Sequence, residues 1–319
     1  MTRTLHHRRL WTGTTMAAAF AAVVGFAGQA VAAEPLVDAA WAAANVGKSG
    51  VVFLDTRGQV DYLRGHIPGA VHTNYAKDGW RVKKGDVVGV LPDDTSKLAK
   101  LIGSLGIDNA THVVLVSPGK TSTDMGISTR LFWTFKVLGD DNVSILNGGM
   151  AAYLAKVDGK GKPVNPLEKG AAKPTAKTFK VALRKDMLPD RNTVKAAIDK
   201  GGVTLVDNRP SDQYLGVTRP PVDTASGTIP TARNVPQQWL TENGGGTFRT
   251  KAELEKLYAA AGVPTTGKQI NFCNTGHWAS VGWFVSSQVL GNKQAEMYDG
   301  SMADWTHHKM PMETKIKVN

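Results

Sequence analysis

The sequence has a single cysteine, Cys273, among its 319 residues. One thiol cannot form a disulfide within its own chain, so no disulfide framework supports this fold. A lone cysteine is an intermolecular bridge, an inert buried residue or a reactive group. The neighbours of Cys273 must decide among these roles.

An apolar run long enough to span a bilayer is also absent. Residues 16–26 form a shorter apolar stretch that follows a basic start with three arginines, and small residues occupy 30–33. This order predicts a signal peptide over residues 1–33, cleaved after Ala32 or Ala33. We therefore expect a periplasmic or secreted protein, with a membrane anchor as the alternative and the export route left open.

No basic run interleaved with aromatic residues occurs, although the formal net charge is +11. Loss of the three leader arginines lowers this charge to +8. The lysines are scattered, which favours small anions or solubility over a nucleic-acid or membrane partner for the mature protein. With 42% hydrophobic and 20% charged residues, the composition is typical of a globular protein, and 319 residues are enough for two ordinary domains.

Two halves of the chain repeat one pattern. An apolar run ends in Asp-x-Arg at 55–57 and again at 207–209. A Gly-x-Ile-Pro-x-Ala turn follows in each half, and later each half has a Gly-Gly-Met or Gly-Ser-Met segment before an aromatic residue. Agreement in order and spacing indicates an internal duplication.

The secondary-structure pattern is the same in both halves. Short β-branched runs alternate with amphipathic segments, which predicts an α/β fold whose two domains are each a mainly parallel sheet flanked by helices. Thr250 and Glu253 predict a capping box at the start of one helix, and Gly262 predicts its end.

The boundary between the halves is marked by composition. Residues 158–177 are rich in Lys, Gly and Pro and lack apolar periodicity. We therefore expect a first domain over 34–157, a linker over 158–180 and a second domain over 181–319.

Cys273 stands between a short apolar run and a helical pattern. A turn from strand to helix can direct successive peptide N–H groups at one point, and the helix N-terminus adds a partial positive charge. Both effects stabilise a thiolate and predict a lowered pKa for Cys273. A buried small hydrophobe is the alternative, but this position is unusual for packing alone.

The combined motifs resemble those of the rhodaneses, the thiosulfate and mercaptopyruvate sulfurtransferases. The likeness rests on the paired Asp-x-Arg and Ile-Pro elements, Cys-x-x-Gly at a strand end and the closing Gly-x-Met segments, and it covers nearly the whole mature chain. It implies two rhodanese-like domains, with the active cysteine, Cys273, in the second. The first domain, without a cysteine, would have a structural or substrate-closing role. No metal or organic cofactor is implied.

The resemblance further implies a two-step sulfur relay. The Cys273 thiolate attacks the outer sulfur of a small anionic donor, with thiosulfate as the first candidate, and sulfite leaves. The persulfide then passes its sulfur to cyanide or a thiol acceptor. Five peptide N–H groups would hold the persulfide charge: those of Asn274, Thr275, Gly276, His277 and Trp278.

The loop departs from both branches of the family. Thiosulfate enzymes typically have Arg-Lys-Gly where this chain has residues 274–276, and an arginine where it has Gln213. Mercaptopyruvate enzymes usually show Cys-Gly-Ser-Gly, which does not match either. Several cations that would bind the donor are therefore missing, and a mercaptopyruvate enzyme or a sulfur carrier without turnover remains an alternative. A Cys-x5-Arg phosphatase is disfavoured because Ala279 replaces the arginine clamp.

Other candidates have two interpretations each. Arg209 lies near the donor or ties local loops to Asp207, and the repeat of this pair in the first half favours the structural role. His277 supplies charge or a proton, or points to solvent. Trp278 dries the pocket or packs on the first domain. His307 and its neighbour lack the spacing of a metal site, and the sequence predicts no oligomeric state.

Overall fold

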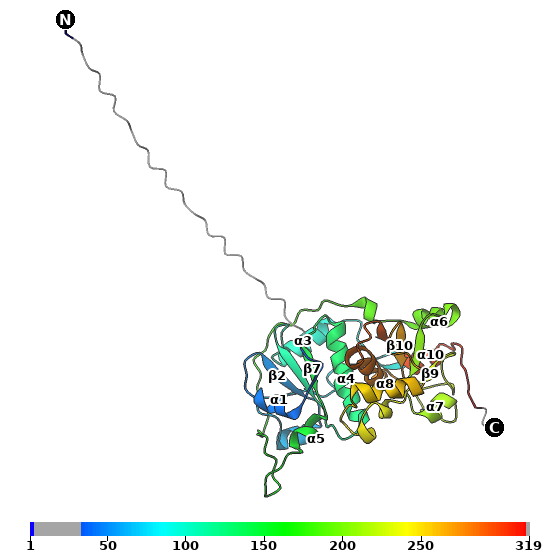
Figure 1. Ribbon diagram of the computed structural model, residues 1–319, viewed down its shortest axis with the longest axis horizontal. Helices are drawn as coiled ribbons and strands as arrows, with labels where there is room; N and C mark the ends of the chain where they lie inside the picture. The colour runs from blue at the N-terminus through cyan, green and yellow to red at the C-terminus, as the bar shows by residue number, and fades with distance from the viewer. Residues whose placement is uncertain (3–32, 317–319) are drawn as a thin grey trace. The chain divides into compact units, whose positions relative to one another are not determined.

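The computed structural model describes residues 1–2 and 33–316 (Figure 1). Its helices and strands are, in chain order, β1 Leu36–Val37, α1 Ala39–Ala44, β2 Val51–Asp55, α2 Gln59–Arg64, β3 Val71–His72, β4 Val82–Lys84, β5 Val87–Val90, α3 Ser96–Ser104, β6 His112–Val116, α4 Ser122–Val137, β7 Val143–Leu146, α5 Gly149–Leu154, η1 Lys185–Met187, α6 Arg191–Lys200, β8 Thr204–Asp207, α7 Ser211–Leu215, β9 Arg233–Asn234, η2 Gln237–Trp239, η3 Glu242–Gly244, α8 Lys251–Ala260, β10 Gln269–Phe272, α9 His277–Phe284, η4 Val285–Val289, β11 Ala295–Met297 and α10 Ser301–His307.

A five-stranded parallel sheet forms the centre of the first half, in the order β1-β7-β6-β2-β3. Helices α1 and α5 cover one face, and α3 and α4 cover the other. The central strand β6 reads His-Val-Val-Leu-Val and is almost entirely buried, as expected of a parallel strand with helices on both sides.

The second half is built on a four-stranded parallel sheet in the order β11-β10-β8-β9. These strands correspond, in the same order, to β7-β6-β2-β3 of the first half. The prediction of two α/β domains with mainly parallel sheets is therefore confirmed, and the sequence repeat is a repeat of topology. The first sheet has β1 as an additional edge strand.

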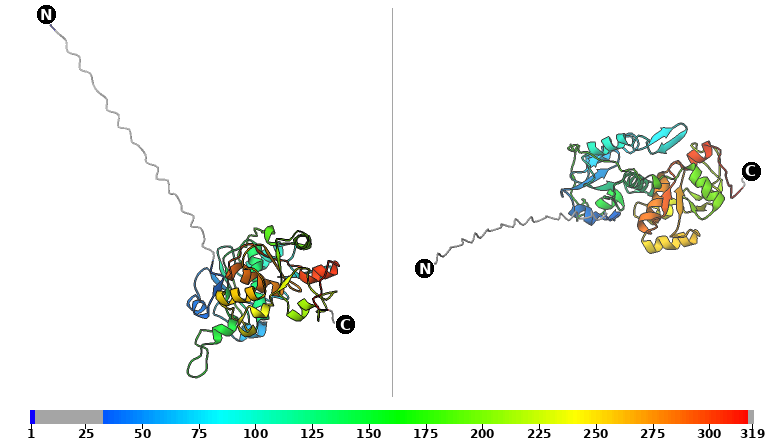
Figure 2. Two further views of the ribbon diagram at one scale, coloured as in Figure 1. Left: turned by 45° about the vertical axis from the view of Figure 1, so that its right-hand side comes forward. Right: turned by 90° about the horizontal axis from the view of Figure 1, so that it is seen from above.

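Helices α4 and α9 pack against each other and join the two halves (Figure 2). The rings of Phe132 and Phe284 meet edge to face with centroids 5.0 Å apart. A hydrogen bond of 2.7 Å links the hydroxyls of Thr129 and Ser280. Because α4 lies between the halves, it is buried nearly all round, as expected of a helix with apolar residues on every side.

An antiparallel hairpin of β4 and β5 was not predicted. It belongs to the first half, but its Val87 and Val90 pack against Ala303 of helix α10 in the second half. The hairpin therefore adds a second point of contact between the halves, close to the end of β10.

The predicted start and end of helix α8 are both found in the structure. Thr250 and Glu253 form the expected capping box, and Gly262 follows α8 with a φ of 66° in the left-handed region. Between residues 155 and 184 there is no helix or strand, but the bounds drawn for the domains and linker remain predictions. The predicted leader lies almost wholly outside the described residues. Among the described residues no helix has the length and apolar character needed to cross a membrane.

Candidate active site

Cys273 directly follows β10 and precedes α9, and its side chain is buried at 1% exposure. Gly276 begins the helix with a φ of 75°. A Cβ at this glycine would lie 2.3 Å from Nη1 of Arg130 on helix α4. Glycine is therefore required both for the turn and for the close approach of the first half.

The surroundings of the Cys273 sulfur have two opposite effects on its pKa. Burial raises the pKa of the thiol, because a thiolate is stabilised by water. The peptide N–H groups of Ala279, Thr275, Trp278 and Gly276 act in the opposite direction, stabilising the thiolate and lowering the pKa. The net direction is upward. The prediction of a lowered pKa was therefore wrong, because the turn that directs the N–H groups also buries the sulfur.

Three of the five predicted N–H groups, those of Thr275, Gly276 and Trp278, lower the pKa of Cys273. The N–H of Ala279, which was not predicted, does the same. Contacts of the Asn274 and His277 N–H groups with a persulfide remain a prediction. The N–H groups of Trp278 and Ala279 belong to the first turn of α9, which begins at His277. N–H groups in the first turn of a helix lack intrahelical partners and are free to contact the sulfur.

Ser301 fixes the backbone of the Cys273 loop by hydrogen bonds. Its hydroxyl oxygen accepts hydrogen bonds of 3.1 Å from the N–H groups of Cys273 and Gly276, and it donates to the carbonyl of Tyr298 at 2.9 Å. Ser301 has a φ of 50°, and the matching Gly149 has 56°. A serine in this strained conformation indicates that its hydroxyl is needed. In the sequence, this role of Ser301 is indicated only by the change from Gly-Gly-Met in the first half to Gly-Ser-Met in the second.

A cavity of about 350 Å³ opens beside Cys273 and is lined by both halves of the chain. The second half contributes Asn274, Thr275, His277 and Trp278 as well as Cys273, and the first half contributes Tyr75, Arg81, Thr123, Asp124 and Ile127. The first-half residues were missed in the sequence, because no motif marks them.

His277 bridges the two halves instead of pointing to solvent. Its Nε2 donates to the Thr123 carbonyl at 3.0 Å, and Nδ1 accepts from the Tyr75 hydroxyl at 3.0 Å, the tautomer being fixed because a carbonyl can only accept. Burial and the nearby Arg81 and Arg130 lower the pKa of His277 to about 4. The ring is therefore neutral at neutral pH, so it does not supply the positive charge that was one of its predicted roles.

Trp278 packs on the first half, as one of its two interpretations predicted. Its Nε1 donates to the Thr123 hydroxyl at 3.2 Å, and its ring lines the cavity. Gly126 on helix α4 makes the approach possible, since a Cβ there would lie 2.5 Å from the His277 ring. His277, the first bulky residue after Gly276, is accommodated because α4 has a glycine opposite its ring.

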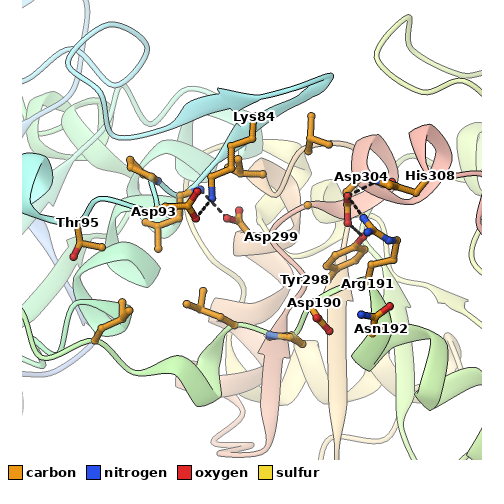
Figure 3. A pocket seen from close by; sticks show the side chains of 18 residues that line it. Lys84, Asp93, Thr95, Asp190, Arg191, Asn192, Tyr298, Asp299, Asp304 and His308 are labelled. Carbon is orange, nitrogen blue, oxygen red and sulfur yellow. Dashed lines mark hydrogen bonds and ion pairs between the residues drawn. The ribbon is translucent and has the colours of Figure 1, made fainter.

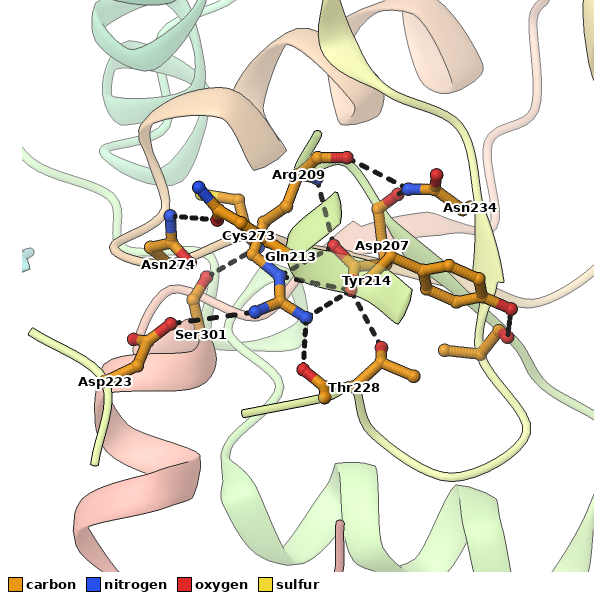
Figure 4. A network of polar contacts seen from close by, with 12 residues as sticks. Asp207, Arg209, Gln213, Tyr214, Asp223, Thr228, Asn234, Cys273, Asn274 and Ser301 are labelled. Atoms are coloured by element: carbon orange, nitrogen blue, oxygen red, sulfur yellow. Dashed lines mark hydrogen bonds and ion pairs between the residues drawn. The ribbon is translucent and has the colours of Figure 1, made fainter. Parts of the chain in front are cut away.

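The side chains of Asn274 and Gln213 are joined by a hydrogen bond. The Asn274 side-chain amide donates to the Gln213 carbonyl oxygen at 2.9 Å (Figure 4). These are two of the positions at which the sequence lacks expected cations. Both side chains are neutral amides, so this pair brings no positive charge to the site.

Arg209 is fully buried and bound within its own domain (Figure 4). Its Nη2 donates to Asp207 at 2.6 Å and to the Gly227 carbonyl at 2.7 Å, and its Nε is shared between the two Asp207 oxygens at 3.0 and 3.1 Å. Its Nη1 lies 3.6 Å from the Asp223 carboxylate. Arg57 makes the same contacts with Asp55 and the Gly65 carbonyl in the first half. Arg209 does not line the cavity beside Cys273, so its predicted structural role fits the geometry better than donor binding.

A larger cavity, of about 510 Å³, lies between the hairpin and the second half (Figure 3). Cys273 is not among its lining residues. Five of its charged side chains pair with one another: Lys84 with Asp93 at 2.5 Å, and Asp304 with Arg191 and, at 2.9 Å, with His308. Asp190 caps helix α6, and Asp299 pairs with Arg130 of helix α4.

Comparison with known proteins identifies the family. The rhodanese-like domain matches twice, at residues 38–156 and 190–308. A bovine thiosulfate sulfurtransferase is 31% identical over 266 residues, covering 80% of this chain and 82% of that protein. A Mycobacterium bovis protein provisionally named as a thiosulfate sulfurtransferase is 30% identical over 288 residues, covering 86% and 94%. The crystal structure of an Escherichia coli 3-mercaptopyruvate sulfotransferase superposes with a TM-score of 0.69 at 23% identity, covering 84% and 99%.

The chain therefore belongs to the rhodanese family, as a tandem of two rhodanese-like domains. It is a sulfurtransferase. The resemblance inferred from its motifs is confirmed, and the interpretation as a carrier without turnover is not favoured.

The raised pKa of Cys273 makes a prediction for its reactivity. Thiolates react with iodoacetamide and thiols do not, so the alkylation rate should rise with pH and reach its midpoint above the ordinary thiol value of 9.0. The same protein unfolded in urea is the control, and its midpoint should fall near the ordinary value. A midpoint near neutral pH in the folded protein would contradict the burial argument.

Proposed function

We propose that Cys273 carries the transferred sulfur as a persulfide. The observation that supports this most directly is the ring of four N–H groups around a buried sulfur. A persulfide is a stronger acid than the parent thiol, so the same N–H groups can hold it as an anion where the resting thiol keeps its proton. The site then favours the loaded state over the empty thiolate.

The first step is a displacement at sulfur. After the thiol proton leaves to solvent, the Cys273 thiolate attacks the outer sulfur of the donor. The sulfur–sulfur bond of the donor breaks, and its electron pair leaves on sulfite if the donor is thiosulfate. In the second step cyanide or a thiolate attacks the outer sulfur of the persulfide, and the Cys273 thiolate is the leaving group.

The donor is proposed from the relatives. The bovine protein that covers most of this chain is named for thiosulfate, and thiosulfate is therefore the first donor to test. Mercaptopyruvate is the second, because the loop after Cys273 follows neither pattern of the family. We propose that the Cys273 cavity binds the donor and that the peptide N–H groups of Thr275, Gly276 and Trp278 contact the transferred sulfur.

Intact mass spectrometry tests the role of Cys273. Purified protein offered thiosulfate or, separately, mercaptopyruvate should gain the mass of one sulfur atom with at least one donor, and cyanide should remove it. Cys273→Ser should gain none, because serine forms no persulfide. Its thermal unfolding, compared with that of the parent, controls for folding, since serine is close to cysteine in size. Sulfur uptake by the folded serine variant would exclude Cys273 as the acceptor.

We also propose that the protein is exported. Three features support this: a basic start, an apolar stretch over 16–26 and small residues at 30–33. The three arginines precede the apolar stretch, which is the order found in signal peptides. Protein recovered from the periplasm or medium should begin at Ala33 or Glu34 by N-terminal sequencing. Recovery of full-length chain from the cytoplasm alone would contradict export.

A further inference from the structure

Among the described residues of the second domain, no lysine or arginine lines the cavity beside Cys273. Arg209 is bound to Asp207 and the Gly227 carbonyl, and Asn274 is bound to Gln213. His277 is neutral at neutral pH, since its pKa is lowered to about 4. A negatively charged donor therefore requires a cation from elsewhere.

The first domain supplies one at the cavity beside Cys273. Arg81 is the only lysine or arginine among the residues that line it. The other charged residue there is Asp124, whose carboxylate accepts from the N–H groups of Lys120 and Thr121 at the start of helix α4. Arg81 is thus the one cationic side chain of the described lining that can pair with an anion.

Arg81 also lacks a partner. Its Nε is buried without a hydrogen bond, and within residues 33–316 no carboxylate pairs with its guanidinium. Lys84 on the same hairpin, in contrast, pairs with Asp93 at 2.5 Å. Buried guanidinium nitrogens normally have hydrogen-bond partners, so the unsatisfied Nε of a half-buried arginine in the lining of the Cys273 cavity indicates a missing anionic ligand.

The hairpin is shaped to hold Arg81 in this place. Its guanidinium carbon lies 4.3 Å from the centre of the Tyr75 ring, a cation–π contact that fixes its plane. Gly89 has a φ of 80°, and a Cβ there would lie 3.1 Å from Arg81 Nη1 and 3.2 Å from the Thr275 carbonyl oxygen. The absence of a side chain at Gly89 lets the arginine and the Cys273 loop approach each other.

The walls of the same cavity are apolar. The rings of Tyr75 and Trp278 and the side chain of Ile127 line it. At about 350 Å³ it has the size of a small-molecule site. One cation between apolar walls suits an anion of single charge with an apolar group better than a small dianion, whose second charge would lose water without gaining a partner.

We propose that Arg81 binds the anionic end of the sulfur donor and that the cavity selects singly charged donors with an apolar group, the chemical class of organic thiosulfonates. The inference rests on the proposed sulfur transfer. The Cys273 thiolate attacks the outer sulfur of the thiosulfonate, the sulfur–sulfur bond breaks, and the sulfinate leaves with the electron pair. Arg81 is a specificity residue contributed by the domain without the nucleophile.

Binding without reaction tests this directly. Calorimetric titration of Cys273→Ser protein with benzenethiosulfonate and with thiosulfate compares the two donors. We expect benzenethiosulfonate to bind more tightly, and Arg81→Gln in the same background to weaken its binding by about tenfold or more, as expected for loss of a hydrogen bond to a charged group. Lys83→Gln is the matched control, because it removes one exposed positive charge from the same hairpin and should leave binding unchanged.

Turnover of the parent enzyme gives the second readout. With cyanide as acceptor, Arg81→Gln should raise KM for benzenethiosulfonate by a similar factor and change kcat little, and Arg81→Lys should recover part of the loss. Equal binding by the Arg81→Gln and Lys83→Gln proteins, or tighter binding of thiosulfate, would overturn the proposal. If binding depends on Arg81 but the parent gains no sulfur at Cys273, the persulfide route fails and the anion site stands.

Discussion

The packing of helix α4 against helix α9 is the constraint on which the site depends. It places Gly126 against the His277 ring and Arg130 against Gly276, both at distances that exclude a Cβ. Arg130 also pairs with Asp299 at 2.5 Å, two residues before Ser301, whose hydroxyl holds the Cys273 loop. The loop that contains Cys273 is thus held on one side by its own domain and on the other by the first domain.

This arrangement gives the first domain a function beyond stability. It has no cysteine, but its Tyr75 orients His277, its Thr123 accepts from both His277 and Trp278, and its hairpin brings Arg81 to the cavity. The duplication therefore produced two domains with one topology and different tasks. One domain contains Cys273 and the N–H groups around its sulfur, and the other completes the cavity and contributes Arg81 to its lining.

Burial has opposite effects on the two states of the sulfur. It raises the pKa of the Cys273 thiol, which slows attack at neutral pH. It also removes water, which strengthens the hydrogen bonds of the N–H groups to any anion that does form there. A loop of this kind is better suited to holding a charged persulfide than to keeping an empty thiolate.

Local patterns in the sequence were sufficient for the fold and for placing Cys273 between a strand and a helix. The repeated Asp-x-Arg pairs predicted two related domains, and in both halves the arginine makes the same contacts with its aspartate and a glycine carbonyl. The turn around Gly276 predicted where N–H groups would gather. These features depend on neighbours in the chain, so a pattern can reveal them.

The features that were missed depend on distant parts of the chain. Tyr75 and His277 are 202 residues apart, and nothing in either segment indicates that they meet. The same holds for Arg81 and for the hairpin that positions it. The direction of the Cys273 pKa could not be predicted either, because it depends on how deeply the second half is covered by the first.

The most direct test of this account is a crystal structure of the protein after reaction with a sulfur donor. The account predicts one additional sulfur bonded to Cys273, enclosed by the cavity and within hydrogen-bond distance of peptide N–H groups between Thr275 and Ala279. An unmodified Cys273, or an added sulfur that turns away from these N–H groups toward solvent, would contradict it.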